Sequence, residues 1–255
     1  MLSQPAIDRL CSALRLDLPL LALYHAEPGP EFEPLIYARG RACCFSYFER
    51  WREGKTLVVE PARGEWGKTE TGCMGMQRAF GISEAQAPWL AHFLTDGKGA
   101  PLGEGLKATP ELAQQWIDRG GTLRAQSRTA LLGPLRLDRF DAAQSVTFFC
   151  DPDRLAALIT LATYWSADPE EVIAPFSSGC GYLWRVLKTL GRDRALVGGT
   201  AVAMRKYLPP NLLTFTVSPA RFERMADFPD EAFLNKEWWK GLMEAREKQV
   251  KDSSQ

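Results

Sequence analysis

Apolar residues occur in short runs that alternate with stretches of helical periodicity, and this alternation limits the folds open to the chain. Residues 56–60 and 212–217 read as strands, because apolar and β-branched side chains dominate them and Gly or Pro residues flank them. Between residues 155 and 165 the apolar side chains instead recur every three or four positions, as on one face of a helix. We therefore expect an α+β protein in which a mixed sheet is flanked by helices.

The same reasoning divides the rest of the chain into elements. Asp151 followed by Pro152 is a typical helix start, and so is Ser218 followed by Pro219. Helices are expected at residues 7–16, 43–51, 74–80, 84–94, 110–119, 152–165, 182–190, 219–225 and 231–248. Strands are expected at residues 18–24, 56–60, 146–149, 171–176, 194–204 and 212–217.

Length and charge exclude several classes of protein. The 255 residues suffice for one large hydrophobic core, so we expect a single compact domain over residues 1–245 and a frayed tail at 246–255. Lys plus Arg and Asp plus Glu each number 31, so no net charge favours nucleic acid or an anionic membrane surface. No apolar run approaches about 18 residues, and charges interrupt the start of the chain. We expect a cytoplasmic protein with no nucleic-acid or membrane partner.

Two stretches repeat the same features, which suggests two pseudo-symmetric halves, residues 1–130 and 131–245. The shared features are a helix that ends in Trp, a strand and a Gly-Cys junction: Trp51, 57–61 and Cys73 in one copy, and Trp165, 172–175 and Cys180 in the other. The offsets, 165 − 51 = 114 and 180 − 73 = 107, differ only by a longer loop in the first copy. A pseudo-twofold axis would bring Cys73 and Cys180 together. Chance similarity of two βα units is the alternative.

The six cysteines are expected to be thiols or metal ligands, because disulfides are rare in a reducing compartment. Cys44, Cys73 and Cys180 are each predicted within or beside the start of a helix, where the helix dipole stabilises a thiolate. Three thiolates can bind an iron–sulfur cluster or another soft metal, with one position left for a different ligand. No CxxC pair is present, so the alternative is that the cysteines pack as small apolar residues.

Other candidate sites are less well formed. His25 and His92 are the only histidines, too few for a His-rich zinc site and without an identifiable triad partner. Residues 198–200, Gly-Gly-Thr, lack the spacing of a dinucleotide-binding loop and the lysine of a P-loop, so a bulge or close backbone packing is the simpler reading. Arg205 and Lys206 could lie beside the thiols and hold an anionic ligand.

Several motifs spread along the chain carry a family resemblance. They are Leu18-Pro-Leu-Leu-Ala-Leu, Arg41-Ala-Cys-Cys44, Gly54-Lys-Thr-Leu-Val-Val, Thr71-Gly-Cys73-Met-Gly-Met, Asp151-Pro-Asp-Arg-Leu, Ser178-Gly-Cys180 and Leu213-Thr-Phe-Thr-Val-Ser-Pro-Ala-Arg-Phe. Together they resemble the domain-of-unknown-function 169 family, an uncharacterised prokaryotic family, over roughly residues 5–228.

The resemblance bears on the cysteines and leaves the reaction open. The family pattern has Cys at positions that look like Cys44, Cys73 and Cys180, which implies a shared thiol site. Many relatives also carry a Cys-rich turn after the next strand, whereas residues 197–205 of this chain contain no Cys. A four-Cys cage of that kind is therefore not expected, and the family has no settled activity to carry over.

One function is favoured over two others. The preferred hypothesis is a redox or metal-handling protein in which Cys44, Cys73 and Cys180 bind an iron–sulfur cluster or another soft metal, with a small-molecule or redox partner. The first alternative is a small-molecule-binding or regulatory module with structural cysteines. The second is an enzyme with a thiol nucleophile, but no partner base is identifiable, so no catalytic residue is named. The metal, the substrate and the oligomeric state do not follow from the sequence.

Overall fold

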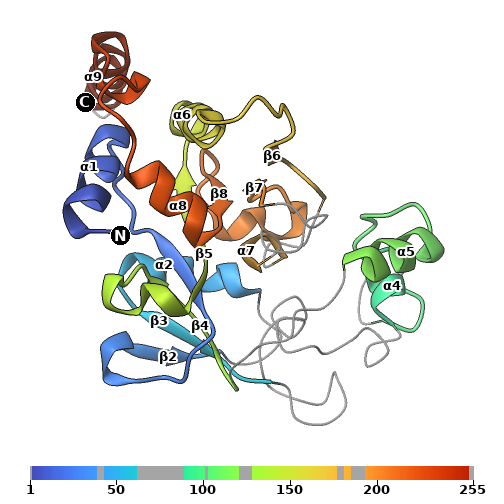
Figure 1. Ribbon diagram of the computed structural model, residues 1–255. Coiled ribbons are helices and arrows are strands. Elements are labelled where there is room, and N and C mark those ends of the chain that lie inside the picture. The colour runs from blue at the N-terminus through green and yellow to red at the C-terminus, as the bar shows by residue number, and fades with distance from the viewer. Residues whose placement is uncertain are drawn as a thin grey trace.

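The computed structural model of the protein describes residues 2–38, 43–61, 89–100, 103–120, 128–176, 181–184 and 193–252. Within these residues, strands form one mixed sheet in the order β2-β3-β4-β1-β5-β8-β7-β6 (Figure 1). The expected α+β fold is therefore confirmed. The strands are β1 (Leu21–Tyr24), β2 (Leu35–Tyr37), β3 (Thr56–Val59), β4 (Ala130–Pro134), β5 (Ala143–Cys150), β6 (Val172–Ile173), β7 (Ala195–Gly198) and β8 (Leu213–Val217).

The strand order repeats from the centre of the sheet outward. β1 and β5 are antiparallel neighbours in the middle. Beyond β1 lie β4, β3 and β2, and beyond β5 lie β8, β7 and β6. In both halves the outermost pair is parallel and the inner pairs are antiparallel. The sheet thus contains two four-stranded halves with one topology, which meet between β4 and β5 in the sequence.

The equivalent strands differ from those that the sequence repeat paired. That repeat matched residues 57–61 with 172–175, which fall at β3 and β6. In the sheet, β6 corresponds to β2, because each is an edge strand that pairs in parallel with its inner neighbour, and β3 corresponds to β7. This part of the interpretation was wrong, because Trp and Gly-Cys landmarks recur at similar spacing without marking equivalent strands. Cys73 follows β3 and Cys180 follows β6, so the two do not occupy equivalent positions.

The helices of the described residues follow the predicted order. None of them is long and apolar enough to cross a bilayer. The α-helices are α1 (Gln4–Leu14), α2 (Phe48–Arg52), α4 (Leu90–Phe93), α5 (Pro110–Gly120), α6 (Pro152–Thr163), α7 (Gly181–Trp184), α8 (Pro219–Ala226) and α9 (Glu237–Asp252). The 3-10 helices are η1 (Pro30–Phe32), η2 (Cys44–Tyr47), η4 (Leu137–Ala142), η6 (Val202–Tyr207) and η7 (Phe233–Asn235). The helix expected at 74–80 lies outside the described residues.

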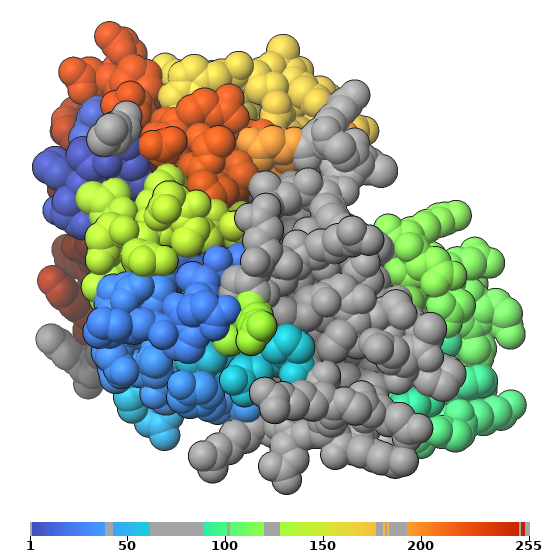
Figure 2. Space-filling model, turned by 60° about the horizontal axis from the view of Figure 1, so that its bottom comes forward, coloured from blue at the N-terminus to red at the C-terminus, as the bar shows by residue number. Residues whose placement is uncertain are grey.

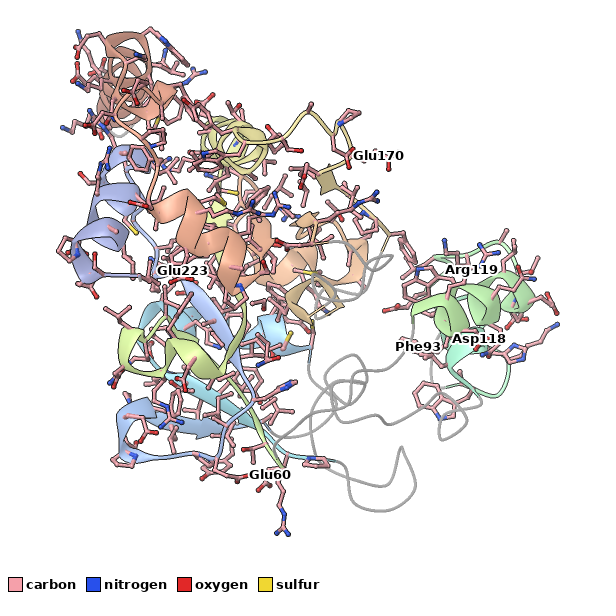
Figure 3. The ribbon with its side chains drawn as sticks, in the orientation of Figure 1. Glu60, Phe93, Asp118, Arg119, Glu170 and Glu223 are labelled. Carbon is pink, nitrogen blue, oxygen red and sulfur yellow. The ribbon has the colours of Figure 1, made fainter. Side chains whose placement is uncertain are left out.

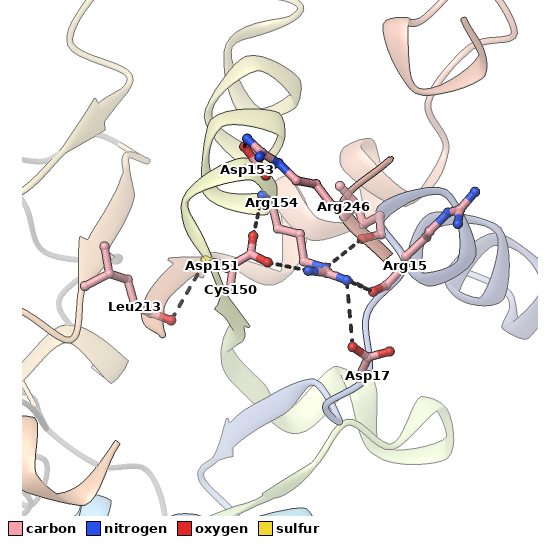
Figure 4. Close-up of polar contacts among 9 residues, drawn as sticks. Arg15, Asp17, Cys150, Asp151, Asp153, Arg154, Leu213 and Arg246 are labelled. Carbon is pink, nitrogen blue, oxygen red and sulfur yellow. Dashed lines mark hydrogen bonds and ion pairs between the residues drawn. The ribbon is translucent and has the colours of Figure 1, made fainter. Parts of the chain in front are cut away.

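One face of the sheet, here called the helical face, is covered by α1, α6 and α8, and α9 packs beside α1 (Figure 1). Its strand side chains are Val146 and Phe148 of β5 and Phe215 and Val217 of β8. The predicted helix caps are confirmed on this side. The side chain of Asp151 accepts a hydrogen bond from the Arg154 amide at 2.9 Å (Figure 4), and Ser218 caps α8 in the same way.

The opposite face, here called the crossover face, carries the chain connections between the parallel strands. Leu21, Leu23, Leu57 and Leu132 of the first half and Phe149 of the second point to this face, while their neighbours in sequence point to the other. The crossover face is covered by η2 and α2 of the β2–β3 connection, by α7 of the β6–β7 connection and by η6. These connections position the candidate site.

A hairpin of α4 and α5 lies to one side of the sheet (Figures 1 and 2). It has a small core of its own, formed by Ala91, Leu94, Ala113 and Ile117. Nε1 of Trp116 donates a hydrogen bond to the carbonyl of Phe176 at 3.1 Å, and the two ring centroids lie 5.0 Å apart. The hairpin, which follows β3 in the first half, therefore touches the segment after β6 in the second half.

Candidate thiol site

Cys44 is the first residue of η2, in the connection between β2 and β3. Its side chain is buried on the crossover face, in one cluster with Phe45 and Trp51. Phe45 and Trp51 meet edge to face at 5.7 Å, and Trp51 stacks on Phe149 of β5 at 6.4 Å. This wall of aromatic rings keeps bulk water away from Cys44.

Segments from the other half of the sheet enter the same cluster. Leu183 belongs to α7, and Met204 belongs to η6. The hydroxyl of Ser145 on β5 donates a hydrogen bond to the carbonyl of Leu183, which fixes α7 over the middle of the sheet. The connections that contain η2 and α7 begin at β2 and β6, on opposite edges of the sheet, and both contribute residues to one apolar cluster with the central strands.

Cys73 and Cys180, the other two predicted ligands, lie outside the described residues. Gly181, which is bonded to Cys180, is the first residue of α7. Val59, the last residue of β3, precedes Cys73 by 73 − 59 = 14 positions. The convergence of the three thiols therefore remains a prediction. Of the three cysteines, Cys44 is the one that lies within the described residues.

Arg205 holds the connection between β7 and β8 together. Its Nη1 donates to the carbonyls of Gly199 (3.1 Å) and Leu212 (2.6 Å), and its Nη2 donates to those of Pro209 (3.2 Å) and Pro210 (2.8 Å). These bonds use both N–H groups of each terminal nitrogen. The Nε–H of Arg205 therefore remains to bind an anionic ligand.

Gly199 has the backbone conformation that the Gly-Gly-Thr segment requires. Its φ is +73°, a value that favours glycine, and a Cβ there would lie 3.1 Å from the amide nitrogen of Thr214. The expected close backbone packing at this segment is thus confirmed.

Lys206 belongs to η6. Its Nζ is 5.1 Å from the centre of the Tyr207 ring. Glu104, in the loop between α4 and α5, is close enough for the two charges to interact: burial raises the pKa of the Glu104 carboxyl, and the Lys206 ammonium partly offsets that rise. The predicted role of Lys206 in holding an anionic ligand remains a prediction.

Two further cysteines are removed from the candidate site. Cys11 on α1 and Cys150 at the end of β5 pack into the helical face. Burial raises the pKa of Cys11 to about 11 and that of Cys150 to about 12, with smaller contributions from Asp8 and Asp151. Both thiols therefore stay protonated at neutral pH. This agrees with the alternative from the sequence, in which cysteines pack as small apolar residues.

In the part of the chain that the structure describes, the two histidines and the carboxylates do not gather at one place. Burial lowers the pKa of His25, and His92 pairs with Asp96 at 2.8 Å on the α4–α5 hairpin. The acidic residues labelled in Figure 3 lie in separate parts of the molecule: Glu60, Asp118, Glu170 and Glu223. Among the described residues, no three His, Cys, Asp or Glu side chains form a group that could bind a metal ion.

Sequence reasoning missed a row of hydroxyl groups on the crossover face. Ser145 and Thr147 of β5 and Thr214 and Thr216 of β8 are all buried. The hydroxyls of Thr147 and Thr216 lie 2.9 Å apart, and that of Thr214 has no hydrogen-bond partner among the described residues. The alternation of Thr with apolar residues in β8 is the sequence pattern that could have revealed this row, because alternate residues of a strand share a face.

Comparison with known proteins gives one match. Residues 9–227 match a protein family, DUF169, whose description reads "Uncharacterised ArCR". Neither a curated protein nor a solved structure matches the chain. The match covers 227 − 9 + 1 = 219 of the 255 residues.

Proposed function

The chain belongs to the domain-of-unknown-function 169 family, and from this premise we propose that it is a cytoplasmic redox or metal-handling protein. Cys44, Cys73 and Cys180 bind an iron–sulfur cluster or another soft metal ion on the crossover face. Thiolates are the ligands that such metals prefer. The metal would supply the electron transfer or the exchange of ions, and the chain would supply the ligands and a dry environment.

The observation that supports the proposal is that Cys44 and Leu183 of α7 belong to one apolar cluster. Leu183 packs in the cluster of Cys44, and the helix that contains Leu183 begins one residue after Cys180. Consecutive Cα atoms are about 3.8 Å apart, so a short span of chain separates Cys180 from this cluster. This closeness in sequence supports the proposal that Cys180 and Cys44 belong to one site.

The surroundings of Cys44 suit a buried redox centre. Phe45, Trp51 and Leu183 provide apolar contacts, and burial with low solvent access is one of the factors that set the potential of a cluster. Lys206, and the Nε–H of Arg205, could neutralise part of the negative charge of a thiolate-bound cluster.

The test is metal and sulfide analysis of protein purified without oxygen. The proposal predicts broad visible absorbance together with iron and acid-labile sulfide, or a stoichiometric amount of another soft metal. A colourless, metal-free protein in which Cys44, Cys73 and Cys180 all react freely with a thiol reagent would refute it.

A second candidate function is the binding of a small organic molecule, and the unpartnered polar groups of the crossover face favour it. Among the described residues, the Thr214 hydroxyl and the Trp51 indole N–H are buried without hydrogen-bond partners. Buried polar groups normally have partners, and a polar ligand could provide them. Substituting Ser at Cys73 and Cys180 separates the two functions. Loss of metal with a retained fold favours the thiol site, whereas loss of stability alone favours cysteines that only pack.

A further inference from the structure

The two halves of the sheet share a register as well as a topology (Figure 1). Each parallel edge pair starts with the first residues of its strands, so that Leu35 faces Thr56 in one half and Val172 faces Ala195 in the other. β3 and β7 also have the same length, four residues. Aligning the two edge pairs therefore assigns each residue of one half a counterpart in the other, because the strand pairing carries the alignment inward.

One row of directly paired residues on the crossover face shows how the halves differ. In the first half the row crosses β2, β3, β4 and β1 through Ile36, Leu57, Leu132 and Leu23. In the second half the row crosses β6, β7, β8 and β5 through Ile173, Leu196, Thr216 and Thr147. The two outer residues are apolar in both halves, whereas the two inner residues change from Leu to Thr.

The neighbouring positions change in the same direction. Val59 pairs with Ala130 in the first half, and their counterparts Gly198 and Thr214 pair in the second. Leu21 corresponds to Ser145 by the same alignment. The second half thus carries four buried hydroxyl groups, here called the hydroxyl strip: Ser145, Thr147, Thr214 and Thr216. Because the first half has Leu or Ala at the same four positions, this topology does not itself require hydroxyl groups there.

The hydrogen bonds among the described residues leave donors of the hydroxyl strip unused. The Ser145 hydroxyl donates to the carbonyl of Leu183. The hydroxyls of Thr147 and Thr216 lie 2.9 Å apart, and only one of the two hydrogens can be donated within that pair. The Thr214 hydroxyl has no hydrogen-bond partner among the described residues. Buried polar groups normally have partners, so these donors point to a bound molecule.

The surroundings of the strip indicate a neutral ligand with an apolar part. Phe149 is paired with Thr214, and its ring stacks on Trp51, whose indole N–H is a second buried donor without a partner among the described residues. None of the residues paired with the strip in the sheet is charged. The terminal N–H groups of Arg205, in the nearby β7–β8 connection, already bind backbone carbonyls. A buried ion would therefore lose its hydration without compensation.

We propose that the hydroxyl strip binds a neutral small molecule that has an apolar body and a carbonyl or amide group, and that Thr214 donates a hydrogen bond to this group. The inference rests on the second candidate function given above and names its class of ligand. Gly198, which pairs with Thr214, supports it, because a glycine inside a strand often marks the close approach of a ligand.

The test is a titration of reduced, metal-free protein with benzamide, a neutral amide on an apolar ring, followed by the NMR signals of the probe. Benzoate has nearly the same shape but carries a negative charge, and we expect it to bind at least about tenfold more weakly. Thr214→Val replaces the hydroxyl by a methyl group and should weaken benzamide binding at least about tenfold. Thr163→Val is the matched control, because the Thr163 hydroxyl bonds to the Ile159 carbonyl within α6, and it should bind benzamide as the wild type does.

The outcomes separate this inference from the functions proposed above. No benzamide binding by the wild type would overturn the inference and the second candidate function together. Equal benzamide affinities of the wild type and Thr214→Val, or tighter binding of benzoate than of benzamide, would overturn the inference alone. The thiol site is measured independently, because Thr214→Val purified without oxygen should contain as much metal as the wild type.

Stability in urea provides a second measurement on the same variant. The Thr214 hydroxyl is buried without a partner among the described residues, so its removal from the ligand-free protein should leave the urea midpoint unchanged or raise it. A midpoint of Thr214→Val clearly below that of Thr163→Val would show that the hydroxyl stabilises the fold, and would overturn its assignment to a ligand.

Discussion

Arg154 shows how much one side chain contributes to the helical face. Its Nε donates to the carbonyls of Leu14 and Arg15, each at 3.0 Å, and its Nη2 donates to that of Arg15 at 2.6 Å (Figure 4). Nη1 pairs with Asp151, the residue that caps α6. One guanidinium thus joins the end of α1 to the start of α6, and satisfies carbonyls that the helix end leaves without partners.

We expect Arg154→Met to lower the free energy of unfolding by about 2–3 kcal/mol. The backbone carbonyls and the Asp151 carboxylate would lose a charged hydrogen-bond donor at a site with little exposure to solvent. Urea denaturation followed by circular dichroism measures the change. Arg246→Met is the matched control, since the Arg246 side chain is 50% exposed and pairs with Asp153 at the surface. That change should cost less than about 1 kcal/mol. Equal losses in the two variants would contradict this account of Arg154.

The ion pair of Glu171 and Arg221 makes stability depend on pH. Burial alone would raise the pKa of the Glu171 carboxyl, but hydrogen bonds from Ser166 and Arg221 outweigh it, and the pKa lies below its ordinary value. A carboxyl whose pKa is lowered by folding stabilises the fold above its unfolded pKa. This stabilisation is lost as the pH falls through the folded pKa.

Glu171→Gln should therefore be less stable than the wild type near neutral pH, and the gap between the two should shrink in acid. Urea midpoints measured from about pH 7 down to about pH 3 test the slope. Glu170→Gln is the control, because the Glu170 side chain is 67% exposed although it pairs with Arg194. A gap that stays constant over the whole range would mean that Glu171 acts by packing and not by its charge.

At the scale of elements, the sequence predicted those whose signals are local. The caps at Asp151 and Ser218 and the apolar stripe of α6 depend on neighbours in the chain, and all three were found. β2 and β4 were missed, because a three-residue edge strand and a strand beside a long insertion have little periodicity of their own. Residues 194–204 were expected as one strand, but β7 ends at Gly198 and η6 follows, since Gly199 turns the chain.

The docking of the α4–α5 hairpin depends on one aromatic contact that sequence periodicity could not show. Trp116 of α5 bonds and packs against Phe176, and the Lys107 ammonium lies 4.2 Å from the same ring. We expect Trp116→Ala to speed amide exchange in α5 and in the segment after β6 at least about tenfold, with a smaller effect on β1 and β5. Hydrogen exchange with mass spectrometry measures each segment.

Trp238→Ala provides the control for that experiment. Trp238 lies in α9, on the helical side of the sheet, is 62% exposed and contacts Phe233 and Trp239. Its removal should leave exchange in α5 unchanged. Equal exchange in the two variants at α5 would show that the Trp116 contact does not hold the hairpin.

At the scale of the whole molecule, the two halves form one folding unit in this account. β1 and β5 join the halves within a continuous sheet, and Phe149 of the second half packs against Phe48 and Trp51 of the first. Phe149→Ala should cost about 3–5 kcal/mol, the usual loss for a buried Phe. It should shift the circular dichroism and tryptophan fluorescence transitions together. Two separated transitions in the wild type or the variant would show that the halves unfold independently.

The sequence indicated a duplicated chain but not its correct alignment. Repeated Trp and Gly-Cys landmarks suggested two halves, yet strand pairing is set by contacts between distant residues, and only the sheet shows that β2 corresponds to β6. The same limit applies to the site. Cys44 could be chosen from its position at a helix start, but its apolar cluster with Leu183 depends on connections from opposite edges of the sheet. The role of Arg205 in holding an anionic ligand stays a prediction, and the bonds from its terminal N–H groups to backbone carbonyls are ones that no local pattern reveals.

X-ray absorption at the edge of the metal found in anaerobically prepared protein tests the central claim most directly, because it reports which atoms surround that metal. We predict that the atoms bound to the metal are sulfur, at about 2.3 Å if the metal is zinc. The shell of bound atoms should lose sulfur in Cys44→Ser and keep it in Cys150→Ser. A shell of oxygen and nitrogen only, or the absence of any bound metal, would contradict this prediction.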